Sequence, residues 1–325
     1  MGFWARESVL AAALLSAGGC VQGQLEPASS TAEIIGGETT SPGAFPATGA
    51  LMYKNVFRCT ATLIAPDVVL TAAHCLPGES ENFGFTLLTQ VPLTPKGFIA
   101  PIDDNSMFAD AGVPDPEEDD IDPPVPTTSQ VYPVLVTHGH PSFDSGGANR
   151  DLSQVNDIGI VILRRPITTV PVEEVDTTFT DVGPGSQLRL TGYGVTAWYL
   201  RFSAGIKHDA MVLVDGVGDY EIRTSAQADA AQPCKGDSGG PLFAETLNGG
   251  HPVTAVVSRS ATPSFQCNQG AIATRVAPYT SWIAEASLDR DVGCSVGGGG
   301  AAKSWTAALV WLLVAFRRRT THRSR

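Results

Sequence analysis

Three short segments of the chain carry side chains that together could perform nucleophilic chemistry. His74 lies in the run Leu70–Cys75, Asp157 precedes an apolar run, and Ser238 lies in the glycine-rich run Gly236–Gly240. A serine hydroxyl is a weak nucleophile until a neighbouring base removes its proton. A histidine could act as that base and then as an acid, while a carboxylate fixes its tautomer and stabilises the imidazolium. The three residues therefore predict acyl transfer, with Ser238 as nucleophile, His74 as base and Asp157 as the carboxylate that orients the histidine.

The glycines around Ser238 have a predicted role in the same chemistry. They would let the backbone turn sharply, so that the N–H groups of Gly236 and Ser238 bind the developing oxyanion. One such donor is typically worth about 2.7–4 kcal/mol, and a side chain at position 236 could obstruct it. Taken singly, each residue has an ordinary structural explanation, as a turn aspartate or a loop glycine. Their joint order, with a cysteine beside two of them, favours a catalytic site.

With these motifs the chain resembles the trypsin/chymotrypsin-like serine peptidases, in which the catalytic residues follow the order His, Asp, Ser. Other serine hydrolases place the same residues in a different order. The likeness extends from Ile34 to about Ser287 and includes Gly192–Gly194, with Tyr193 where Trp is usual. It implies an all-β fold of two six-stranded antiparallel Greek-key β-barrels with a short C-terminal helix. It also implies that neither a metal nor an organic cofactor is needed.

The strand pattern independently predicts an all-β body. The chain contains 34 Gly and 23 Pro, which suit many short strands joined by turns. Helical periodicity is scarce. The clearest β-rich runs are Val68–Thr71, Ile158–Leu163, Leu188–Thr191 and Val253–Val257.

The six cysteines divide into two groups. Cys20 and Cys294 each lie in a terminal processing signal, and four remain in the body. Cysteines of an exported protein are expected to pair, and four of them permit three pairings. The family resemblance selects one of these, with the bridges Cys59–Cys75 and Cys234–Cys267.

The segment Ile34–Gly37 resembles the family's activated N-terminus. The likeness implies that cleavage after Glu33 frees the amine of Ile34, which then pairs with Asp237 and shapes the oxyanion hole. Trypsin-type zymogens commonly carry Arg or Lys where this chain has Glu33. We therefore expect a Glu-tolerant protease or self-cleavage as the activator. The alternative is processing elsewhere, without this form of activation.

Four residues bear on substrate recognition. Gln232 stands where trypsin-like members carry the aspartate that recognises Arg or Lys, so an Arg/Lys preference is not expected. Ser258, Arg259 and Ser260 correspond to the substrate-pairing strand, with Arg259 where Trp is typical. Arg259 could favour acidic substrate residues. Its alternative role is that of a solvated cation at the rim.

The charge of the chain is unevenly distributed. The net charge of −12 argues against a nucleic-acid partner. Residues 21–302 carry −18, because six cations and no anions follow residue 302. Nine acidic residues lie in 103–122, where several prolines exclude a helix and favour a mobile, solvated loop. Calcium binding is the alternative there, although no regular ligand spacing is present.

The two ends of the chain are predicted to be targeting signals. We expect a signal peptide at 1–20, with Cys20 lipidated if it is a lipoprotein signal, and a propeptide at 21–33. The peptidase domain is expected at 34–287. Residues 288–325 form a Gly-rich spacer, a hydrophobic segment and an Arg-rich end. This tail resembles myxobacterial sorting tails, which are processed at a cysteine, here Cys294. The alternative is a single-pass membrane anchor.

The sequence thus predicts a serine endopeptidase made as a zymogen and secreted or anchored at a bacterial surface, extracellular or on the outer membrane. Its expected partners are protein or peptide substrates, an activating protease, sorting machinery at the tail, and the membrane through tail or lipid. Two rivals stay open: a catalytically silent surface-binding homologue and an esterase. Intact His74, Asp157, Gly236 and Ser238 weigh against the silent homologue.

Overall fold

The computed structural model of the chain describes residues 37–91, 130–144, 152–178, 181–196, 204–227, 231–245, 250–262, 267 and 269–291. The predictions for Cys20, the Glu33–Ile34 bond, the acidic stretch 103–122 and the tail from Cys294 lie outside these residues. No helix within the described ranges is long and apolar enough to cross a membrane. The apolar run of the tail, Trp305–Phe316, lies outside the described residues, so this finding does not cover it.

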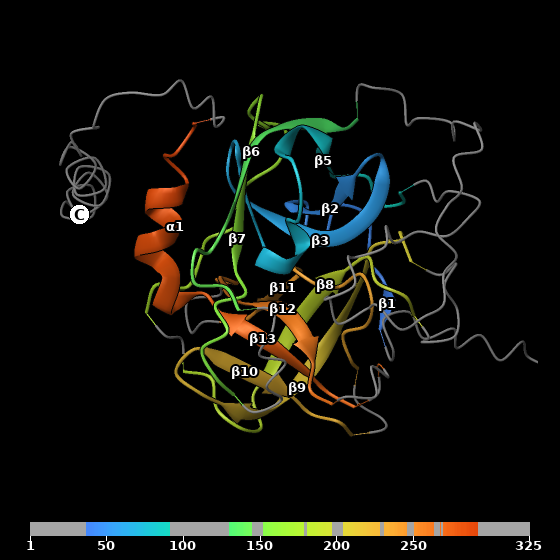
Figure 1. Cartoon of the computed structure of the whole chain (residues 1–325). Helices are drawn as coiled ribbons and strands as arrows, with labels where there is room; N and C mark the ends of the chain where they lie inside the picture. Colours follow the sequence, from blue (N-terminus) through green and yellow to red (C-terminus); the bar gives the residue numbers. More distant parts are fainter. Residues whose placement is uncertain are drawn as a thin grey trace, which may run out of the picture. The chain divides into compact units, whose positions relative to one another are not determined.

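Six strands of the N-terminal half close into the first barrel, in the order β2-β3-β4-β7-β6-β5 (upper part of Figure 1). The neighbouring strands are antiparallel. The strands are β2 (Thr48–Tyr53), β3 (Val56–Ala65), β4 (Val68–Thr71), β5 (Phe83–Thr86), β6 (Tyr132–Gly139) and β7 (Gly159–Leu163). The short 3-10 helices η1 (Ala73–Cys75) and η2 (Ser80–Asn82) follow β4.

Strands β4 and β7 are buried on both faces, which explains their continuous apolar sequences. Successive side chains of a strand point to opposite faces. Val69 and Val161 accordingly join the cluster that fills the first barrel. Leu70 and Ile160 join a different cluster, which also contains Phe243 of the second barrel. These two strands therefore form part of the contact between the barrels.

The second barrel closes in the order β9-β10-β13-β12-β11-β8, through the pairing of β8 with β9, and β1 pairs with the first residues of β9. The prediction of two six-stranded antiparallel barrels with a short C-terminal helix is confirmed. The elements are β1 (Glu38–Thr39), β8 (Gln187–Gly192), β9 (His208–Val217), β10 (Glu221–Thr224), β11 (Pro241–Phe243), β12 (Val253–Ser260) and β13 (Ala271–Arg275), then η4 (Ala277–Tyr279) and α1 (Thr280–Ala286).

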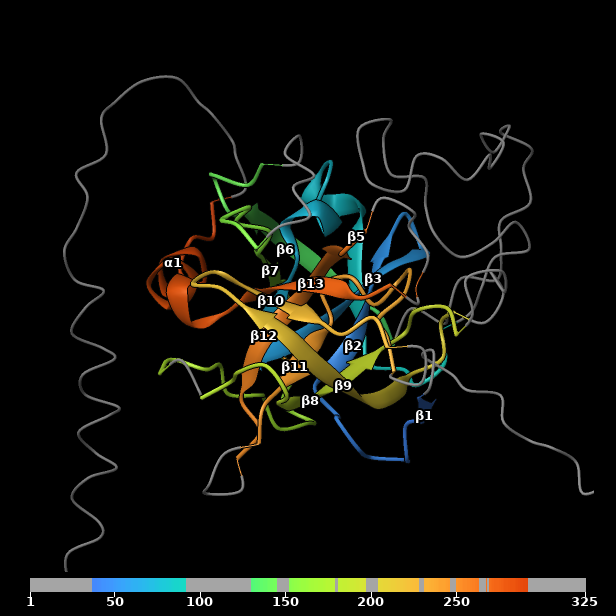
Figure 2. The same ribbon diagram turned by 90° about the horizontal axis from the view of Figure 1, so that it is seen from below.

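Helix α1 follows the last strand of the second barrel but lies beside β6 and β7 of the first (Figures 1 and 2). Its buried residues Ile283 and Ala286 belong to the same cluster as Ile160 of β7 and Val253 of β12. Beyond the helix, the Nε2 atom of His138 lies 2.9 Å from the carbonyl oxygen of Asp289. The C-terminal segment thus links the two barrels.

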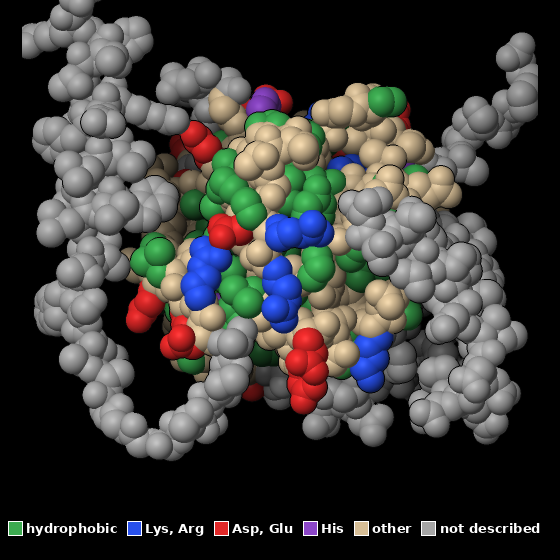
Figure 3. Space-filling view, turned by 90° about the horizontal axis from the view of Figure 1, so that it is seen from above, with side chains coloured by type: hydrophobic (Ala, Val, Ile, Leu, Met, Phe, Trp, Pro, Cys, Tyr) green, Lys and Arg blue, Asp and Glu red, His purple; other side chains and the backbone are tan. Residues whose placement is uncertain are grey.

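The acidic character of the chain does not give one uniformly acidic surface. On the face seen in Figure 3, basic and acidic side chains alternate with apolar ones. Much of the predicted excess of negative charge lies in residues 103–122, which are not described.

Candidate active site

The ends of two paired strands bring His74 and Asp157 together. His74 lies in η1, directly after β4, and Asp157 lies two residues before β7. These strands pair antiparallel with Thr71 opposite Gly159. The Nδ1 atom of His74 is 2.7 Å from Oδ2 of Asp157, and the backbone N–H of His74 donates to Oδ1 over 3.0 Å. One carboxylate thus holds both the ring and the backbone of the histidine.

Asp157 is buried but remains a carboxylate. Its side chain is 1% exposed and that of His74 is 8% exposed. Burial by itself would raise the pKa of Asp157, but the charge of His74 and hydrogen bonds from His74 and Ser258 together lower it below its ordinary value. The Ser258 hydroxyl donates to Oδ2 over 2.6 Å. The sequence suggested Ser258 only as a substrate-pairing residue, and this contact with Asp157 was missed.

The residue before Asp157 is held in an unusual backbone conformation. Asn156 has φ of +59°, a left-handed conformation that asparagine tolerates better than most residues. Its amide nitrogen donates to the Ser142 carbonyl over 2.9 Å, and the Tyr279 hydroxyl donates to its Oδ1 over 3.0 Å. Tyr279, at the start of the C-terminal segment, therefore helps to orient the chain that leads into Asp157.

Ser238 lies in the loop between β10 and β11, and its neighbours reach both other parts of the site. Its carbonyl oxygen accepts a hydrogen bond from the N–H of Thr60 over 3.0 Å. The N–H of Gly239 donates to the carbonyl of Val257, which precedes Ser258, over 2.7 Å. A Cβ atom on Gly239 would lie 2.1 Å from Oγ1 of Thr71 and 3.0 Å from the nitrogen of Ala72, two residues before His74. Ser238 is therefore placed close to the His74 and Ser258 segments.

The backbone before Ser238 needs glycine at position 236. Gly236 has φ of +99°, and a Cβ there would lie 2.9 Å from a ring carbon of Phe57 and 3.0 Å from Cα of Gly194. The N–H groups of Gly236 and Ser238 donate to no acceptor among the described residues. Two unused donors on one tight turn are suited to binding a negative oxygen.

Asp237 is fully buried behind this turn. Its carboxylate accepts the N–H groups of Gly194 and Cys234, each over 2.8 Å. Burial raises its pKa to about 7, although both hydrogen bonds act to lower it. A Cβ on Gly192 would lie 2.1 Å from Oδ1 of Asp237, and one on Gly194 would lie 2.5 Å from its Cγ. The Gly-Tyr-Gly motif is therefore explained by the space that this carboxylate occupies.

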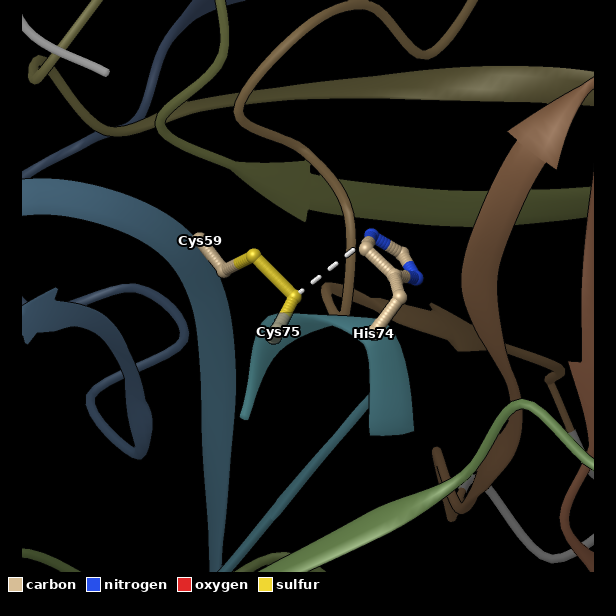
Figure 4. Close-up of side chains that lie close together, drawn as sticks. All are labelled: Cys59, His74 and Cys75. Atoms are coloured by element: carbon tan, nitrogen blue, oxygen red, sulfur yellow. Dashed lines mark hydrogen bonds between the residues drawn. A yellow bond between two sulfur atoms is a disulfide. The ribbon is translucent and has the colours of Figure 1, made fainter. Parts of the chain in front are cut away.

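Both disulfides are formed as predicted, Cys59–Cys75 and Cys234–Cys267. The first joins β3 to η1, and Sγ of Cys75 lies 3.7 Å from Nε2 of His74 (Figure 4). Potential ligand atoms of Cys59, His74 and Cys75 lie within 4.8 Å of one another. The two sulfurs are bonded to each other, however, and a metal requires thiolates. This cluster is a bridge beside the histidine, not a metal site.

Gln232 is buried, and its amide is bonded at both ends. Its Oε1 accepts the N–H of Gly270 over 3.0 Å, and its Nε2 donates to the carbonyl of Ser225 and, over 3.5 Å, to that of Gln227. The side chain thus joins two backbone segments. Ser260 pairs with Ala271 of β13, and its hydroxyl donates to the nearby carbonyl of Thr262 over 3.0 Å.

Arg259 requires a correction. It is neither a solvated cation at the rim nor a charge available to acidic substrates, because it is buried and paired with Glu221. Glu221 lies on β10, 38 residues earlier in the chain. The spacing along the sequence gave no sign of this partner.

A protein of two antiparallel β-barrels, with a histidine–aspartate pair from one barrel beside a glycine-rich serine loop from the other, has the architecture of a serine peptidase. The chain belongs to the trypsin family. The family described as Trypsin matches residues 34–92 and 124–283. The part that it omits, 93–123, includes the acidic stretch 103–122, for which the sequence predicts a solvated loop.

Known proteases resemble most of the chain. Human kallikrein-11 is 25% identical over 272 residues, covering 78% of this chain and 82% of its own length. Brachyurin from Leptuca pugilator is 26% identical over 268 residues, covering 77% and 96%. Human granzyme M is 24% identical over 264 residues, covering 77% and 88%. With the family, these relatives identify the chain as a serine-type endopeptidase, a hydrolase.

Proposed function

We propose that Ser238, His74 and Asp157 form a catalytic triad that hydrolyses peptide bonds through an acyl-enzyme. The observation that carries this proposal is the 2.7 Å contact between Nδ1 of His74 and Asp157. It fixes the orientation of the ring and places the ring proton on Nδ1, so that Nε2 is the nitrogen that would accept the proton of the Ser238 hydroxyl. The hydroxyl oxygen attacks the substrate carbonyl, and His74 passes the proton to the leaving amine. In the second half of the reaction His74 takes a proton from water, which attacks the acyl-enzyme. The peptide acid is released, and His74 returns the proton to Ser238.

In this mechanism the negative oxygen of each tetrahedral intermediate is bound by the N–H groups of Gly236 and Ser238. Support comes from their lack of other acceptors among the described residues. Asp157 stays ionised, held by Ser258 and by the backbone and ring of His74. It stabilises the imidazolium that forms when His74 takes the proton.

We also infer a zymogen switch. Cleavage between Glu33 and Ile34 would free an amine that pairs with Asp237. Asp237 is buried, its carboxylate accepts the backbone N–H groups of Gly194 and Cys234, and burial raises its pKa to about 7. A cation beside it would favour the ionised carboxylate, which is costly to bury alone. Because Glu33 precedes the bond to be cut, the activator would be a protease that tolerates Glu at that position, or the enzyme itself.

For specificity, we propose that the enzyme does not prefer Arg or Lys. Gln232 carries no charge, and both ends of its amide are bonded to backbone groups. The guanidinium of Arg259 is paired with Glu221, so an attraction for acidic substrates is no longer supported. An uncharged residue at this position suits uncharged substrate side chains.

The location of the enzyme belongs to the same proposal. Residues 1–20 would direct export, 34–287 would form the enzyme, and 288–325 would meet sorting machinery or anchor it to a membrane. Protein or peptide substrates would then be met outside the cell. Intact-mass measurement on native material tests this, because lipidation of Cys20 or loss of the tail after Cys294 changes the mass by a defined amount.

The catalytic proposal is tested with a fluorophosphonate probe, which reacts with an activated serine. Wild-type protein cleaved at Glu33–Ile34 should be labelled, and Ser238→Ala should not. The absence of labelling after cleavage has been verified by N-terminal sequencing would refute the triad. Cleavage of a peptide library would then give the preferred substrate side chain. A clear preference for Arg or Lys would contradict the role given to Gln232. Labelling together with hydrolysis of esters but not of any peptide would indicate an esterase.

A further inference from the structure

Thr60 links the first barrel to the loop of the second barrel that carries Gly236 and Ser238. It follows Cys59 in β3 and is 0% exposed. Its Oγ1 accepts the N–H of Tyr193 over 3.1 Å and donates to the carbonyl oxygen of Gly236 over 2.8 Å. The direction of the second bond is fixed, because a carbonyl oxygen has no proton to give. The backbone N–H of Thr60 also holds the carbonyl of Ser238, over 3.0 Å.

These contacts complete a set that fixes each peptide group of the loop. The carbonyl of Lys235 accepts the N–H of Val195, and that of Asp237 accepts the N–H of Gly240, each over 2.8 Å. The peptide group between Gly236 and Asp237 is held at its carbonyl by Thr60 and at its N–H by the Cys234 carbonyl, over 3.0 Å. A peptide group is planar, so a carbonyl held in place also fixes the N–H of the same group. The Lys235 and Asp237 carbonyls share their groups with the N–H of Gly236 and of Ser238, and the group held by Thr60 lies between these two.

We propose that Thr60 is a positioning residue that keeps the N–H groups of Gly236 and Ser238 aimed at the oxyanion. Gly236 has no side chain to restrict its own rotation, so its conformation depends on restraints from outside the loop. The Thr60 hydroxyl supplies one from the opposite barrel. This inference rests on the proposed function, since it assigns a role within the same catalytic site.

A purely structural role has to be separated from this one. A Cβ on Gly240 would lie 3.2 Å from the Thr60 methyl group, so the methyl also packs against the loop. Thr60→Val keeps the shape and removes the hydroxyl, whereas Thr60→Ser keeps the hydroxyl and removes the methyl. Thr62→Val is the matched control. Thr62 lies two residues further along β3 and is equally buried, and its hydroxyl has no hydrogen-bond partner within the described ranges.

The experiment uses the full chain, with each variant processed identically as judged by N-terminal sequence and intact mass. For each we measure kcat and KM on the best library peptide, and the inhibition constant of a peptide aldehyde of that sequence. The aldehyde forms a tetrahedral adduct whose oxygen occupies the oxyanion position. Loss of a direct oxyanion donor costs about 100- to 1000-fold in kcat, so an indirect restraint should cost about tenfold.

We expect Thr60→Val to lower kcat and aldehyde affinity by the same factor, about tenfold, with KM nearly unchanged. Thr60→Ser should recover most of the rate, and Thr62→Val should behave as wild type. A Thr60→Val enzyme equal to Thr62→Val, an effect on KM alone, or equal losses in Thr60→Val and Thr60→Ser would overturn the proposal. If Thr60→Val does not fold, Thr60→Ala and Thr60→Ser make the same comparison. An inactive wild-type enzyme would instead refute the proposed function.

Discussion

Arg259 and Glu221 form a buried bidentate ion pair, with Nη1 to Oε1 at 2.6 Å and Nη2 to Oε2 at 2.9 Å. Each side chain is 1% exposed. Oε2 also accepts the N–H of Ser153 over 2.8 Å, and Nη1 donates to Oγ of Ser258 over 3.4 Å. The pair therefore lies directly behind the hydroxyl that contacts Asp157.

Removing one partner of this pair should destabilise the fold strongly. Arg259→Met and Glu221→Gln each leave a buried charge without its partner, for which we expect a loss of roughly 3–5 kcal/mol. The double variant Arg259→Met/Glu221→Met should lose less than either single variant, because no buried charge remains. Urea unfolding of the three variants measures this. Single-variant losses below about 1 kcal/mol would contradict the burial of the pair.

Gln232→Glu should destabilise the protein in a pH-dependent way. The amide nitrogen that donates to the carbonyls of Ser225 and Gln227 would become an oxygen, and we expect a loss of about 1–3 kcal/mol at pH 8. At pH 5 part of this is recovered, since a protonated carboxyl can donate. Gln227→Glu, at an exposed position, is the control and should change little. Equal losses in the two variants would contradict the bonding inferred for Gln232.

Asp237 should make the uncleaved chain less stable as pH rises. Its pKa is about 7 in the folded protein against an ordinary value of 3.8, so between these values the folded state binds one proton more than the unfolded state. This stability is fully present below about pH 4 and is lost as pH rises through 7. The loss between pH 5 and pH 8 should be about 3 kcal/mol. Unfolding of Ser238→Ala, which avoids self-cleavage, measures it.

Two comparisons isolate the contribution of Asp237. Ser238→Ala/Asp237→Asn should lack this part of the pH dependence, because asparagine does not titrate. Cleavage at Glu33–Ile34 should also reduce it, because the new amine would favour the carboxylate. Identical pH profiles with and without Asp237 would show that its carboxyl is not perturbed.

Tyr279→Phe should weaken the support of Asp157. It removes the hydroxyl that donates to Asn156, for which we expect about 1 kcal/mol of lost stability and a several-fold fall in kcat. Tyr220→Phe is the control, since its ring centroid lies 6.2 Å from that of Tyr279, whereas the tyrosine hydroxyl that contacts Asn156 is that of Tyr279. Unfolding and kinetics of both variants test this. A fall in kcat shared equally by Tyr220→Phe would remove the special role of Tyr279.

Local sequence determined much of the fold and the candidate residues. The apolar run Val68–Thr71 was predicted as a strand with the bounds that β4 has in the structure. Its residues face two apolar clusters, so alternation is absent and a continuous apolar run marks it. The need for glycine at position 236 was likewise predicted from the sequence, and its positive φ angle restricts the residue type there. The bridges Cys59–Cys75 and Cys234–Cys267 followed once the family had been recognised.

Only the tertiary structure decided which partners these residues meet. The Thr60 hydroxyl meets Gly236 across 176 positions, and the Ser258 hydroxyl meets Asp157 across 101. Arg259 was misread for the same reason, since its charge is satisfied by Glu221 on another strand. A side chain's type limits the bonds that it can make. Which group lies within reach depends on how the two barrels close and pack, and that is a property of the whole chain.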